Sequence, residues 1–283
     1  TLACAKFQFL LSSKNFTNIR GNMGNNTKRQ FLILSLLIVY LAFLGLRVIA
    51  QDEHTIVLYN FETGNGKTVK DLSGKGNDGK FEGKKLHWGG GKFGGSLVFG
   101  GNATQDHIVV PDNESLWIKD GLTVEMWVFL NFWSTAGGTG VTKEKSYKVG
   151  PQSGGKTVLM MTTNEKVWGK AGITSSTDIP LKSWHHLAAT YDAKTGQAKV
   201  YLDGRLDGKG KIGGTIQANN DVLWLGRGAG PFLDGRMDEV RISNIARTER
   251  EIITLMEKGI EGMLEISPKS KLTTSWSYLK TKR

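Results

Sequence analysis

Two neighbouring stretches of alternating side chains constrain the fold of this chain more than any other feature. Over residues 184–192, apolar side chains recur at every second position, which is the period-two pattern of a half-buried strand. The alternation resumes over residues 197–202 and ends at Asp203-Gly204, a pair that favours a tight hairpin turn. The pattern predicts antiparallel strands joined by short turns. The apolar positions of the first stretch are Leu187, Ala189 and Tyr191.

A third stretch, residues 122–130, predicts a strand that is covered on both faces. Every second residue from Leu122 onward is apolar, and the intervening positions carry Thr123, Glu125 and Trp127. Strands of this kind are typical of two sheets packed face to face. The 37 glycines far outnumber the 5 prolines and fall between apolar runs, where turns are expected. We therefore predict an all-β fold, a two-sheet antiparallel sandwich.

One segment near the C-terminal end predicts a short helix. Thr248 and Glu251 have the spacing of a capping box, in which each side chain bonds the backbone N–H of the other residue. Apolar residues follow at positions 252, 253, 255 and 256, and Gly259 stands where a C-terminal cap is expected. A single helix after many strands indicates a closing element rather than a second domain.

The first fifty residues predict export. Met23 and a basic lead precede an apolar run over residues 31–46, and Ala50 ends a short segment suited to signal peptidase. The run is short for a membrane span, which needs roughly 20 residues. Cleavage after Ala50 is therefore favoured over an uncleaved anchor. The predicted organisation is upstream read-through and a signal peptide over 1–50, a domain over 51–258 and a tail over 259–283.

Cysteine content and charge narrow the function classes. The single cysteine, Cys4, precedes the predicted cleavage point, so the mature chain would contain no disulfide and no thiol nucleophile. Residues 1–50 hold six of the 37 basic residues and none of the 26 acidic ones, which leaves 31 against 26, or +5. Scattered lysines favour a solvated surface over a nucleic-acid-binding stripe. These lysines are Lys80, Lys84, Lys85, Lys92, Lys143, Lys145 and Lys148.

Eight short motifs occur in a fixed order between residues 55 and 258. They are Tyr59–Glu62, Asp71–Gly79, Phe93–Phe99, His107–Asp112, Leu122–Val128, Trp184–Asp192, Val200–Gly204 and Gly235–Ile242. Together they resemble laminin G-like (LamG-like) domains of the concanavalin A-like lectin/glucanase superfamily, of the bacterial exported type. The resemblance implies a two-sheet jelly roll that binds glycans, proteins or cell-surface partners, in many members with a calcium ion.

Asp238 is the predicted metal ligand. It alternates onto the same side as Val240 and Ile242, so it is expected to point inward, where an unpaired carboxylate is costly. Calcium takes oxygen ligands of this kind. The resemblance implies that Glu62, in the first strand region, lies beside it. We expect either a Ca²⁺ ion held by Asp238 and Glu62, or a structural salt bridge or turn cap.

The sequence contains no evident catalytic constellation. A retaining glycosidase needs two carboxylates about 5–5.5 Å apart, which on a strand means acids at alternate positions. Residues 122–130 carry only Glu125, and the adjacent Asp238 and Glu239 are expected to face opposite ways. His185 and His186 are likewise expected on opposite faces, as packed and hydrogen-bonded histidines rather than one metal site. A glycan hydrolase is therefore the less favoured hypothesis.

Aromatic residues in glycine-rich segments predict a carbohydrate site. Sugar recognition combines an aromatic face with a few amide or carboxylate hydrogen bonds. Trp127 and Trp184 lie in strand patterns and are expected in the core. Residues 133–155 look like the longest loop, where a specificity site would lie. The predicted ligand-binding residues are Trp133, Trp168 and Phe232.

These observations together predict an exported, non-catalytic binding module, either secreted, at the cell surface or in the periplasm. It would recognise carbohydrate through loops at the rim of the sandwich. The alternative is a cell-surface protein-interaction or adhesion module. We expect no nucleic-acid partner and no membrane span in the mature chain. The tail after Gly259 would be either a docked strand or a frayed end.

Overall fold

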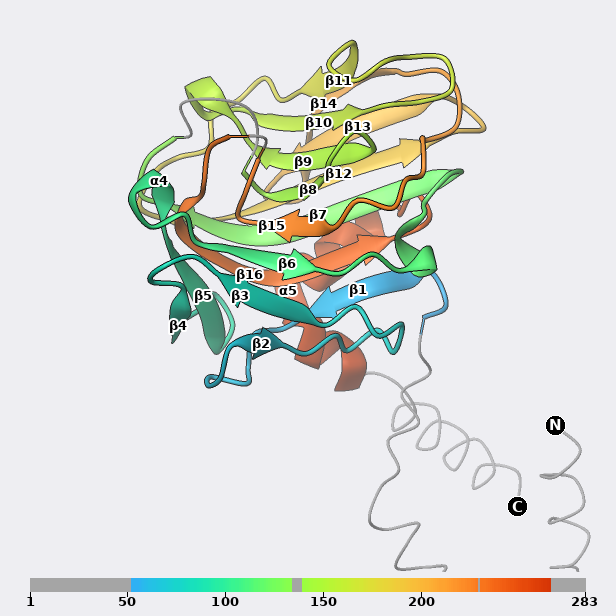
Figure 1. Ribbon diagram of the computed structural model, residues 1–283. Helices are drawn as coiled ribbons and strands as arrows, with labels where there is room; N and C mark the ends of the chain where they lie inside the picture. Colours follow the sequence, from blue (N-terminus) through green and yellow to red (C-terminus); the bar gives the residue numbers. More distant parts are fainter. Residues whose placement is uncertain (1–51, 134–138, 229, 266–283) are drawn as a thin grey trace, which may run out of the picture. The chain divides into compact units, whose positions relative to one another are not determined.

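A computed structural model describes residues 52–133, 139–228 and 230–265 (Figure 1). The predicted signal segment and residues 266–283 of the tail lie outside the described residues. The described part forms two eight-stranded antiparallel sheets that pack into a sandwich, with one longer helix near its C-terminal end. The predicted fold class is therefore confirmed.

The first sheet contains the two stretches of alternating residues. Its strand order is β14-β13-β12-β7-β16-β5-β4, and β1 also pairs with β16. The turn Asp203-Gly204 joins β13 to β14, and both of its residues have positive φ (51° and 75°), as a tight hairpin requires. The strands are β1 (Thr55–Tyr59), β4 (His87–Gly90), β5 (Gly95–Gly100), β7 (Gly121–Leu130), β12 (Trp184–Asp192), β13 (Gln197–Leu202), β14 (Arg205–Lys211) and β16 (Asp234–Ser243).

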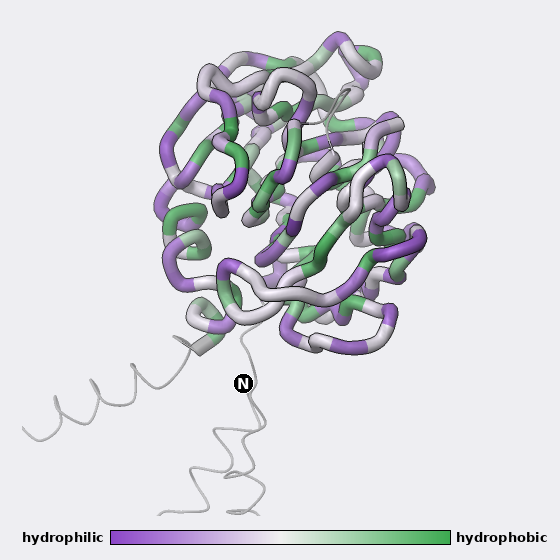
Figure 2. Tube along the Cα trace, turned by 90° about the vertical axis from the view of Figure 1, so that its left-hand side faces the viewer, coloured by the Kyte–Doolittle hydropathy of each residue, from purple (hydrophilic) through white to green (hydrophobic). Residues whose placement is uncertain are grey.

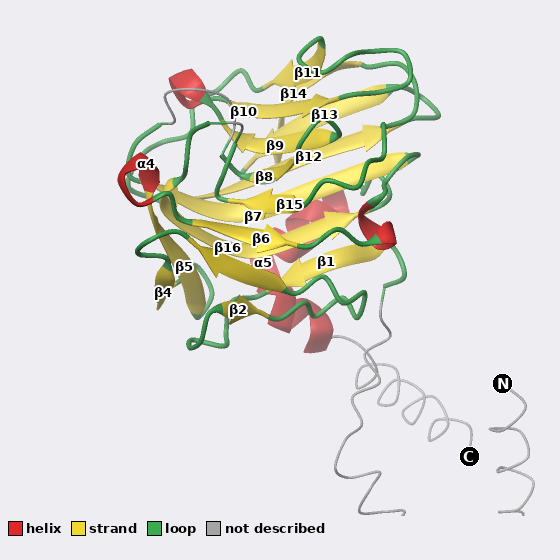
Figure 3. Ribbon diagram, in the orientation of Figure 1, coloured by secondary structure: helices red, strands yellow, loops and turns green. Residues whose placement is uncertain are grey.

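The second sheet has the order β11-β10-β9-β8-β15-β6-β3-β2. Three short helices lie at the ends of the sandwich (Figure 3): α4 (Gly101–Thr104), η1 (Glu114–Leu116) and η2 (Ser153–Gly155). The strands are β2 (Thr68–Val69), β3 (Gly79–Glu82), β6 (His107–Val110), β8 (Val141–Lys143), β9 (Tyr147–Pro151), β10 (Thr157–Met161), β11 (Ala171–Thr174) and β15 (Leu223–Leu225).

The core lies between the sheets. The apolar face of β7 is fully buried there, as the alternation predicted, and apolar residues of β12 lie on the same side. Facing strands of the second sheet contribute residues such as Val149, Leu159 and Leu225. Figure 2 shows hydrophobic and hydrophilic residues interspersed along the chain, with hydrophilic residues in many of the peripheral segments. Burial of this apolar surface is the main stabilising contribution to the fold.

Helix α5 (Glu249–Glu265) packs against the outer face of the first sheet, where Ile252 contacts Ala188 and Tyr201. The predicted capping box is confirmed. The Thr248 backbone N–H donates to Glu251 Oε2 at 2.9 Å, and the Glu251 N–H donates to Thr248 Oγ1 at 3.3 Å. Within the described ranges, no helix is long and apolar enough to cross a membrane.

Gly259 has a non-helical backbone (φ 65°, ψ 173°) that divides α5 into two helical segments, and the first of them ends at this residue, where the cap was predicted. The second segment reaches Glu265, and Ile260 at its start is fully buried against Leu58 and Leu255. The packed part of the chain therefore extends a few residues into the segment predicted as a tail.

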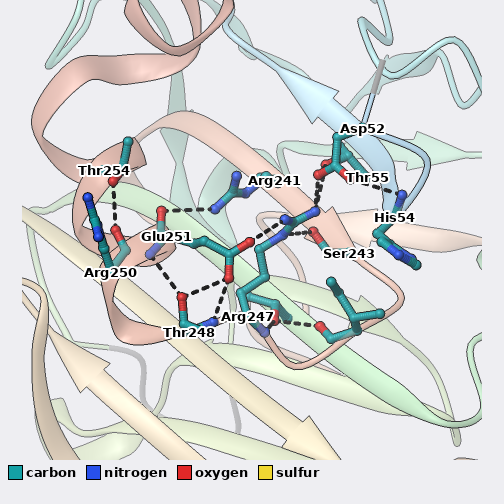
Figure 4. Close-up of polar contacts among 12 residues, drawn as sticks. Asp52, His54, Thr55, Arg241, Ser243, Arg247, Thr248, Arg250, Glu251 and Thr254 are labelled. Carbon is teal, nitrogen blue, oxygen red and sulfur yellow. Dashed lines mark hydrogen bonds and ion pairs between the residues drawn. The ribbon is translucent and has the colours of Figure 1, made fainter. Parts of the chain in front are cut away.

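Arg247 ties α5 to the first strand (Figure 4). Its guanidinium donates to Ser243 Oγ at 2.9 Å and to Glu251 Oε1 at 2.9 Å, and it also forms an ion pair with Asp52. Thr55 Oγ1 donates to the same aspartate at 2.9 Å. The described N-terminal end and the C-terminal helix are thus fastened at one point.

Candidate binding site and carboxylate cluster

A pocket of about 290 Å³ lies at the end of the sandwich that carries α4 (Figure 1). Two of the three predicted aromatic residues, Trp133 and Phe232, line it together, and Phe132 adds a third ring. The other lining residues come from α4, from the strand ends and from the connection before β16. They are Gly100, Gly101, Asn102, Ala103, Leu130, Thr139, Pro151, Pro231, Leu233 and Asp234.

Trp133 is held in place in the aromatic wall of this pocket although it remains accessible. Trp133 Nε1 donates to the carbonyl of Ile179 at 2.8 Å, while the residue stays 40% exposed. Gly155 lies so close that a Cβ there would be 2.7 Å from the indole, so only glycine fits beneath the ring. Phe132 is 65% exposed. The Trp133 side chain therefore loses little conformational freedom when a ligand stacks on it.

The lining residues from α4 and from the start of β16 are held by hydrogen bonds and also offer free polar groups. The Phe232 N–H donates to Asn102 Oδ1 at 2.9 Å, and Asn131 Nδ2 donates to Asp234 Oδ1 at 2.8 Å. The Asn102 amide nitrogen and Asp234 Oδ2 make no hydrogen bond to another described residue. Phe132, Asn102 and Asp234 were not predicted from the sequence as site residues. Phe132 could have been predicted, because it is adjacent to the candidate Trp133.

Trp168 lies elsewhere. The Lys148 ammonium is 5.7 Å from the centroid of its ring, on the outer face of the second sheet, and Trp168 does not line the pocket. Of the strand tryptophans, Trp127 is buried as expected, whereas Trp184 is only half-buried, with its ring 5.9 Å from that of Phe129. Of the three predicted ligand-binding aromatics, Trp133 and Phe232 therefore share one pocket, and Trp168 lies outside it.

Residues 133–155 are not one long loop, contrary to the sequence interpretation. They contain β8 and β9, which pair with each other and with strands on either side. Gly140 and Gly150 pack so tightly that a Cβ on either would clash with the other residue. These glycines, which suggested a loop, are needed for the close approach of two strands.

Asp238 does not face the core, and this part of the metal prediction was wrong. Glu239 has a positive φ (53°), and the register of β16 on β7 shifts between Asp238 and Arg241. This bulge inserts one extra residue, so Asp238 lies opposite Trp127, on the outer face, whereas Val240 and Ile242 face inward. Asp238 is nevertheless fully buried.

The loop between β4 and β5 covers Asp238. Asp238 Oδ2 accepts hydrogen bonds from the backbone N–H groups of Lys92 (2.9 Å) and Phe93 (3.0 Å). In the same loop the Gly95 N–H donates to Glu62 Oε1 at 3.0 Å. A Cβ on Gly91 would lie 2.6 Å from Asp238 Oδ2, and one on Gly94 would overlap the Glu62 carboxylate. The predicted pair therefore shares one glycine-rich cradle.

Glu239 joins this pair, which contradicts the expectation that Asp238 and Glu239 face apart. Burial, with a smaller contribution from Glu62, raises the pKa of Asp238 to about 7. Burial, together with the charges of Asp238, Glu62 and Glu261, raises the pKa of Glu239 to about 8. The bulge that the sequence does not reveal thus creates a carboxylate cluster, which we define as Glu62, Asp238 and Glu239.

The carboxylate cluster borders a pocket of about 350 Å³ between the loop and α5. Its lining includes Glu62, Glu239, Lys258 and Glu261. Among the residues that the structure describes, no group of three or more His, Cys, Asp or Glu side chains is arranged so that it could hold a metal ion. A cation here would have to combine the carboxylates with other oxygens, and hard oxygen donors of this kind suit calcium.

The two histidines have different surroundings. His185 bridges Ser183 Oγ (2.8 Å from Nε2) and Asp203 Oδ2 (2.8 Å from Nδ1). His186 is fully buried against Trp127, and burial lowers its pKa to about 3. Neither ring nitrogen of His186 has a hydrogen-bond partner among the described residues. His185 is thus hydrogen-bonded as predicted, whereas His186 is packed without partners.

Glu125, the acid of the third stretch, is fully buried beneath α5. Its Oε1 accepts from Arg241 Nε at 2.7 Å, and its Oε2 lies 3.7 Å from His186 Nε2. Burial raises the pKa of Glu125 despite the arginine. The arrangement is a buried ion pair that fastens β7 to β16.

Two lysines expected on a solvated surface are buried. Lys143 has no exposed side-chain area and donates to Asp112 at 2.9 Å. Lys148 is 5% exposed, and burial lowers its pKa. Lys143 lies on the core side of β8, in register with Leu223, which the glycine-rich sequence around it does not indicate.

Two antiparallel sheets packed face to face, with pockets formed by the connections at their ends, define a jelly-roll β-sandwich. The chain belongs to the concanavalin A-like lectin/glucanases superfamily, because a laminin G-type family model of that superfamily matches residues 99–253. A search of curated protein sequences found no match.

Several solved structures have similar folds. Domain 4 of an extracellular arabinanase from Geobacillus stearothermophilus, in complex with arabinotriose, shares 22% identity at a TM-score of 0.57, over 72% of this chain and 98% of that domain. The binding domain of Paraclostridial mosquitocidal protein 1 shares 17% identity at 0.56, over 72% and 52%. The binding domain of botulinum neurotoxin DC, in complex with SialylT, shares 15% identity at 0.57, over 72% and 51%. The chain thus spans about half of each toxin domain, and these similarities establish the fold alone.

Proposed function

We propose that this chain is a carbohydrate-binding module whose ligand occupies the pocket lined by Phe132, Trp133 and Phe232. The observation that carries the proposal is the convergence of three rings from two separate segments on a small pocket with free polar groups at Asn102 and Asp234. Aromatic faces stack on the C–H faces of sugars, while amides and carboxylates bond their hydroxyl groups. The arabinotriose complex of the similar arabinanase domain supports this ligand class.

The size of the pocket favours a short saccharide. At about 290 Å³ it lies near the lower end of the range for ligand pockets, roughly 300–1,000 Å³. A protein partner, the alternative, would need about 800 Å² of surface on each side. The large exposed apolar side chains of the described residues are scattered, apart from the adjacent Phe132 and Trp133. They are Trp117, Phe132, Trp133, Val167 and Leu206.

A glycan array tests the proposal with a matched pair of variants. Trp133→Ala removes the fixed wall of the pocket, whereas Trp168→Ala removes a tryptophan outside it. We expect the wild-type chain and Trp168→Ala to bind the same glycans and Trp133→Ala to bind none. An array on which the wild-type chain binds nothing would instead favour the cell-surface protein-interaction alternative.

The proposed module is non-catalytic towards glycans. Glu125 is fully buried in its pair with Arg241, and Asp238 and Glu239 are covered by the β4–β5 loop and α5. None of the three lines the proposed sugar pocket, where a glycosidase would need two facing carboxyl groups. The acid closest to the sugar would be Asp234 alone.

One arrangement of side chains suggests a second candidate function, acyl transfer, which we consider and do not favour. Ser183, His185 and Asp203 are hydrogen-bonded in the order of a Ser-His-Asp catalytic triad. However, the other oxygen of Asp203 accepts the His186 N–H at 2.8 Å, and the pocket that reaches Asp203 is not lined by Ser183 or His185. We therefore favour a structural role. Hydrolysis of p-nitrophenyl acetate that is lost in Ser183→Ala would reverse this preference.

We further propose that the carboxylate cluster binds Ca²⁺. The support is the cradle in which Gly91 and Gly94 leave no room for a side chain beside Asp238 and Glu62, together with the mutual repulsion of the buried Asp238 and Glu239 and the exposed Glu62. Glu62 and Asp238 would supply the ligands, and the ion would neutralise their charge. EDTA should lower the melting temperature of the wild-type chain but not that of Asp238→Asn. An equal melting temperature with and without EDTA would contradict the proposal.

We also propose that the protein is exported, to the medium, the cell surface or the periplasm. The support is the order of the basic lead, the apolar run and Ala50 in the sequence. Mass spectrometry of the protein recovered from the expressing cells should give a chain that begins at Gln51. Recovery of a membrane-bound chain that retains residues 31–46 would favour the anchor alternative.

A further inference from the structure

A second pocket, of about 550 Å³, lies near η1, whereas the first lies beside α4. Figure 3 shows these two short helices at opposite ends of the sandwich, connected by β6. The second pocket has one aromatic wall and one wall rich in amides. Its lining residues are Trp117, Lys119, Thr215, Ile216, Gln217, Ala218, Asn219 and Asn220.

Trp117 forms the aromatic wall, and a hydrogen-bonded N–H group at the edge of its indole ring holds it in place. Its indole N–H donates to both carboxylate oxygens of Asp112, at 3.1 and 3.2 Å. The residue nevertheless remains 42% exposed. An indole held in this way is ordered before a ligand arrives, so stacking on it costs little conformational entropy.

Asp112 is itself fixed by the buried Lys143. The ammonium lies 2.9 Å from Asp112 Oδ1 and also donates to the backbone carbonyl of Asp221, at the end of the amide-rich wall. Partial burial raises the pKa of Asp112, but hydrogen bonds from Lys143 and Trp117 outweigh this effect and lower it. One buried cation therefore connects both walls of the pocket.

The ion pair is buried on the lysine side only: the Lys143 side chain has no exposed area, whereas that of Asp112 is 24% exposed, and stability alone does not explain burying that lysine. An apolar pair of the same volume is often as stable or more stable, because removing two charges from water is costly. The ion pair of Lys143 and Asp112 does, however, set the geometry of Trp117 relative to the segment that ends at Asp221. Its structural consequence is therefore the shape of the second pocket.

The amide-rich wall is fastened independently. The Ile216 N–H donates to the carbonyl of Lys119 at 2.9 Å, and the Gln217 N–H donates to the carbonyl of Thr162 at 2.9 Å. Asn219 Nδ2 donates to the carbonyl of Glu144 at 2.7 Å. Backbone and side-chain bonds thus hold the segment that faces Trp117.

Three polar groups of this pocket are left for a ligand. The side chains of Asn220 and Lys119 and the Gln217 amide oxygen make no hydrogen bond to another described residue. No acidic residue lines the pocket. An ordered aromatic face with amide and ammonium groups in the same pocket is the combination that binds sugar rings through stacking and hydroxyl hydrogen bonds.

We propose that the Trp117 pocket is a second saccharide-binding site, with Trp117 as the stacking platform and Asn220 and Gln217 as hydroxyl partners. Lys143 is a positioning residue that keeps Trp117 opposite these amides. The inference rests on the proposed function for the class of ligand, but the second site binds independently of the first. Two sites at opposite ends would let one molecule bridge two glycan chains and gain avidity.

Indole N–H resonances in NMR spectra test the two sites separately. The chain has eight tryptophans, and Trp117→Phe and Trp133→Phe identify the two relevant signals. Arabinotriose, xylotriose and cellotriose serve as probes, titrated into the full-length protein. We expect at least one of them to shift the Trp117 signal saturably and to do so equally in Trp133→Ala. Asn220→Ala should weaken this binding about fivefold, the loss of one hydrogen bond.

Lys143→Met tests the positioning role. We expect it to move the Trp117 signal in the free protein and to abolish its sugar-induced shift, while the Trp133 response stays unchanged. If Lys143→Met fails to fold, Asp112→Asn provides the same test because it weakens the same link. A Trp117 response that neither variant changes would overturn the assigned role of Lys143.

The remaining outcomes separate this inference from the proposed function. A probe that shifts Trp133 and leaves Trp117 unchanged would overturn the second site and support the first pocket. A probe that shifts only Trp117 would support the second site and overturn the first. If none of the three sugars shifts either signal, both assignments are overturned for neutral saccharides of this size.

Discussion

The two faces of the first sheet are both buried, but by different chemistry. Met126 on β7 packs into the apolar core between the sheets, whereas its neighbour Glu125 points outward to Arg241 and His186 under α5. The inner face is stabilised by contacts that tolerate changes of similar volume. The outer face is stabilised by matched charges, each of which becomes a cost when its partner is lost. Substitutions at residues adjacent in sequence are therefore expected to change stability for different physical reasons.

The largest effect is expected from breaking the outer ion pair. Arg241→Met leaves Glu125 buried without a cationic partner, and we expect it to lower the free energy of unfolding by about 3–5 kcal/mol. Urea unfolding at pH 7 measures this loss. The loss should be smaller at pH 5, because Glu125, whose pKa burial already raises, would take up a proton.

The matched control removes both charges. Because an apolar pair avoids the desolvation cost, Glu125→Leu combined with Arg241→Met should restore most of the lost stability. A double variant that is less stable than Arg241→Met would contradict this account. It would indicate that the outer face needs the carboxylate for a contact other than the one with Arg241.

The inner face should respond through volume instead. Met126→Ala removes a fully buried side chain from the core and should cost about 2–5 kcal/mol, depending on how far the cavity collapses. Met126→Leu, which keeps the volume, should cost less than about 1.5 kcal/mol. Neither loss should depend on pH between 5 and 7. If the stability lost in Met126→Ala depended on pH, the proposed difference between the two faces would be contradicted.

The inner face was predictable from sequence, and the outer one was not. Alternation over β7 and β12 identifies which residues face the core, and Asp203-Gly204 and the Thr248 capping box are local signals. What covers the outer face depends on contacts between segments far apart in the chain. The register shift of β16 at Glu239 is such a contact, and it reversed the predicted direction of Asp238.

The candidate sites show the same division. Trp133 and Phe232 could be identified as rim aromatics from their glycine-rich surroundings, and the structure brings them into one pocket. Their partners Asn102 and Asp234 lack any local signal, because they reach the pocket through α4 and the start of β16. Lys143 looked like one of many surface lysines, since its burial depends on the pairing of β8 with β15.

The carboxylate cluster gives the outer face a pH dependence that the inner face lacks. The folded-state pKa values of Asp238 (about 7) and Glu239 (about 8) exceed those of exposed carboxyls, so the folded state holds protons that the unfolded state has released. In EDTA, stability should therefore fall as pH rises from 6.5 to 8, by up to about 1.4 kcal/mol per pH unit for each carboxyl.

This window avoids the opposing effect of His186. Because burial lowers the pKa of His186 to about 3, that residue contributes a rise of stability with pH only below its ordinary value of 6.5. Asp238→Asn should reduce the slope between pH 6.5 and 8, and bound Ca²⁺ should flatten it by favouring the charged carboxylates. If the free energy of unfolding in EDTA did not change between pH 6.5 and 8, the carboxylate cluster would not titrate in this range, which would contradict the prediction. Urea unfolding at a series of pH values measures the slope.

The smallest effect is expected at the helix that covers the outer face. Thr248→Ala removes one half of the capping box and should cost about 1 kcal/mol of unfolding free energy. The more informative measurement is hydrogen exchange of backbone amides. Because α5 covers the outer face but contributes little to the core between the sheets, exchange should accelerate in α5 and leave the amides of β12 and β13 unchanged. Acceleration in all these elements alike would show that the helix and both faces unfold as one cooperative unit, and that the two faces differ in chemistry without differing in local stability.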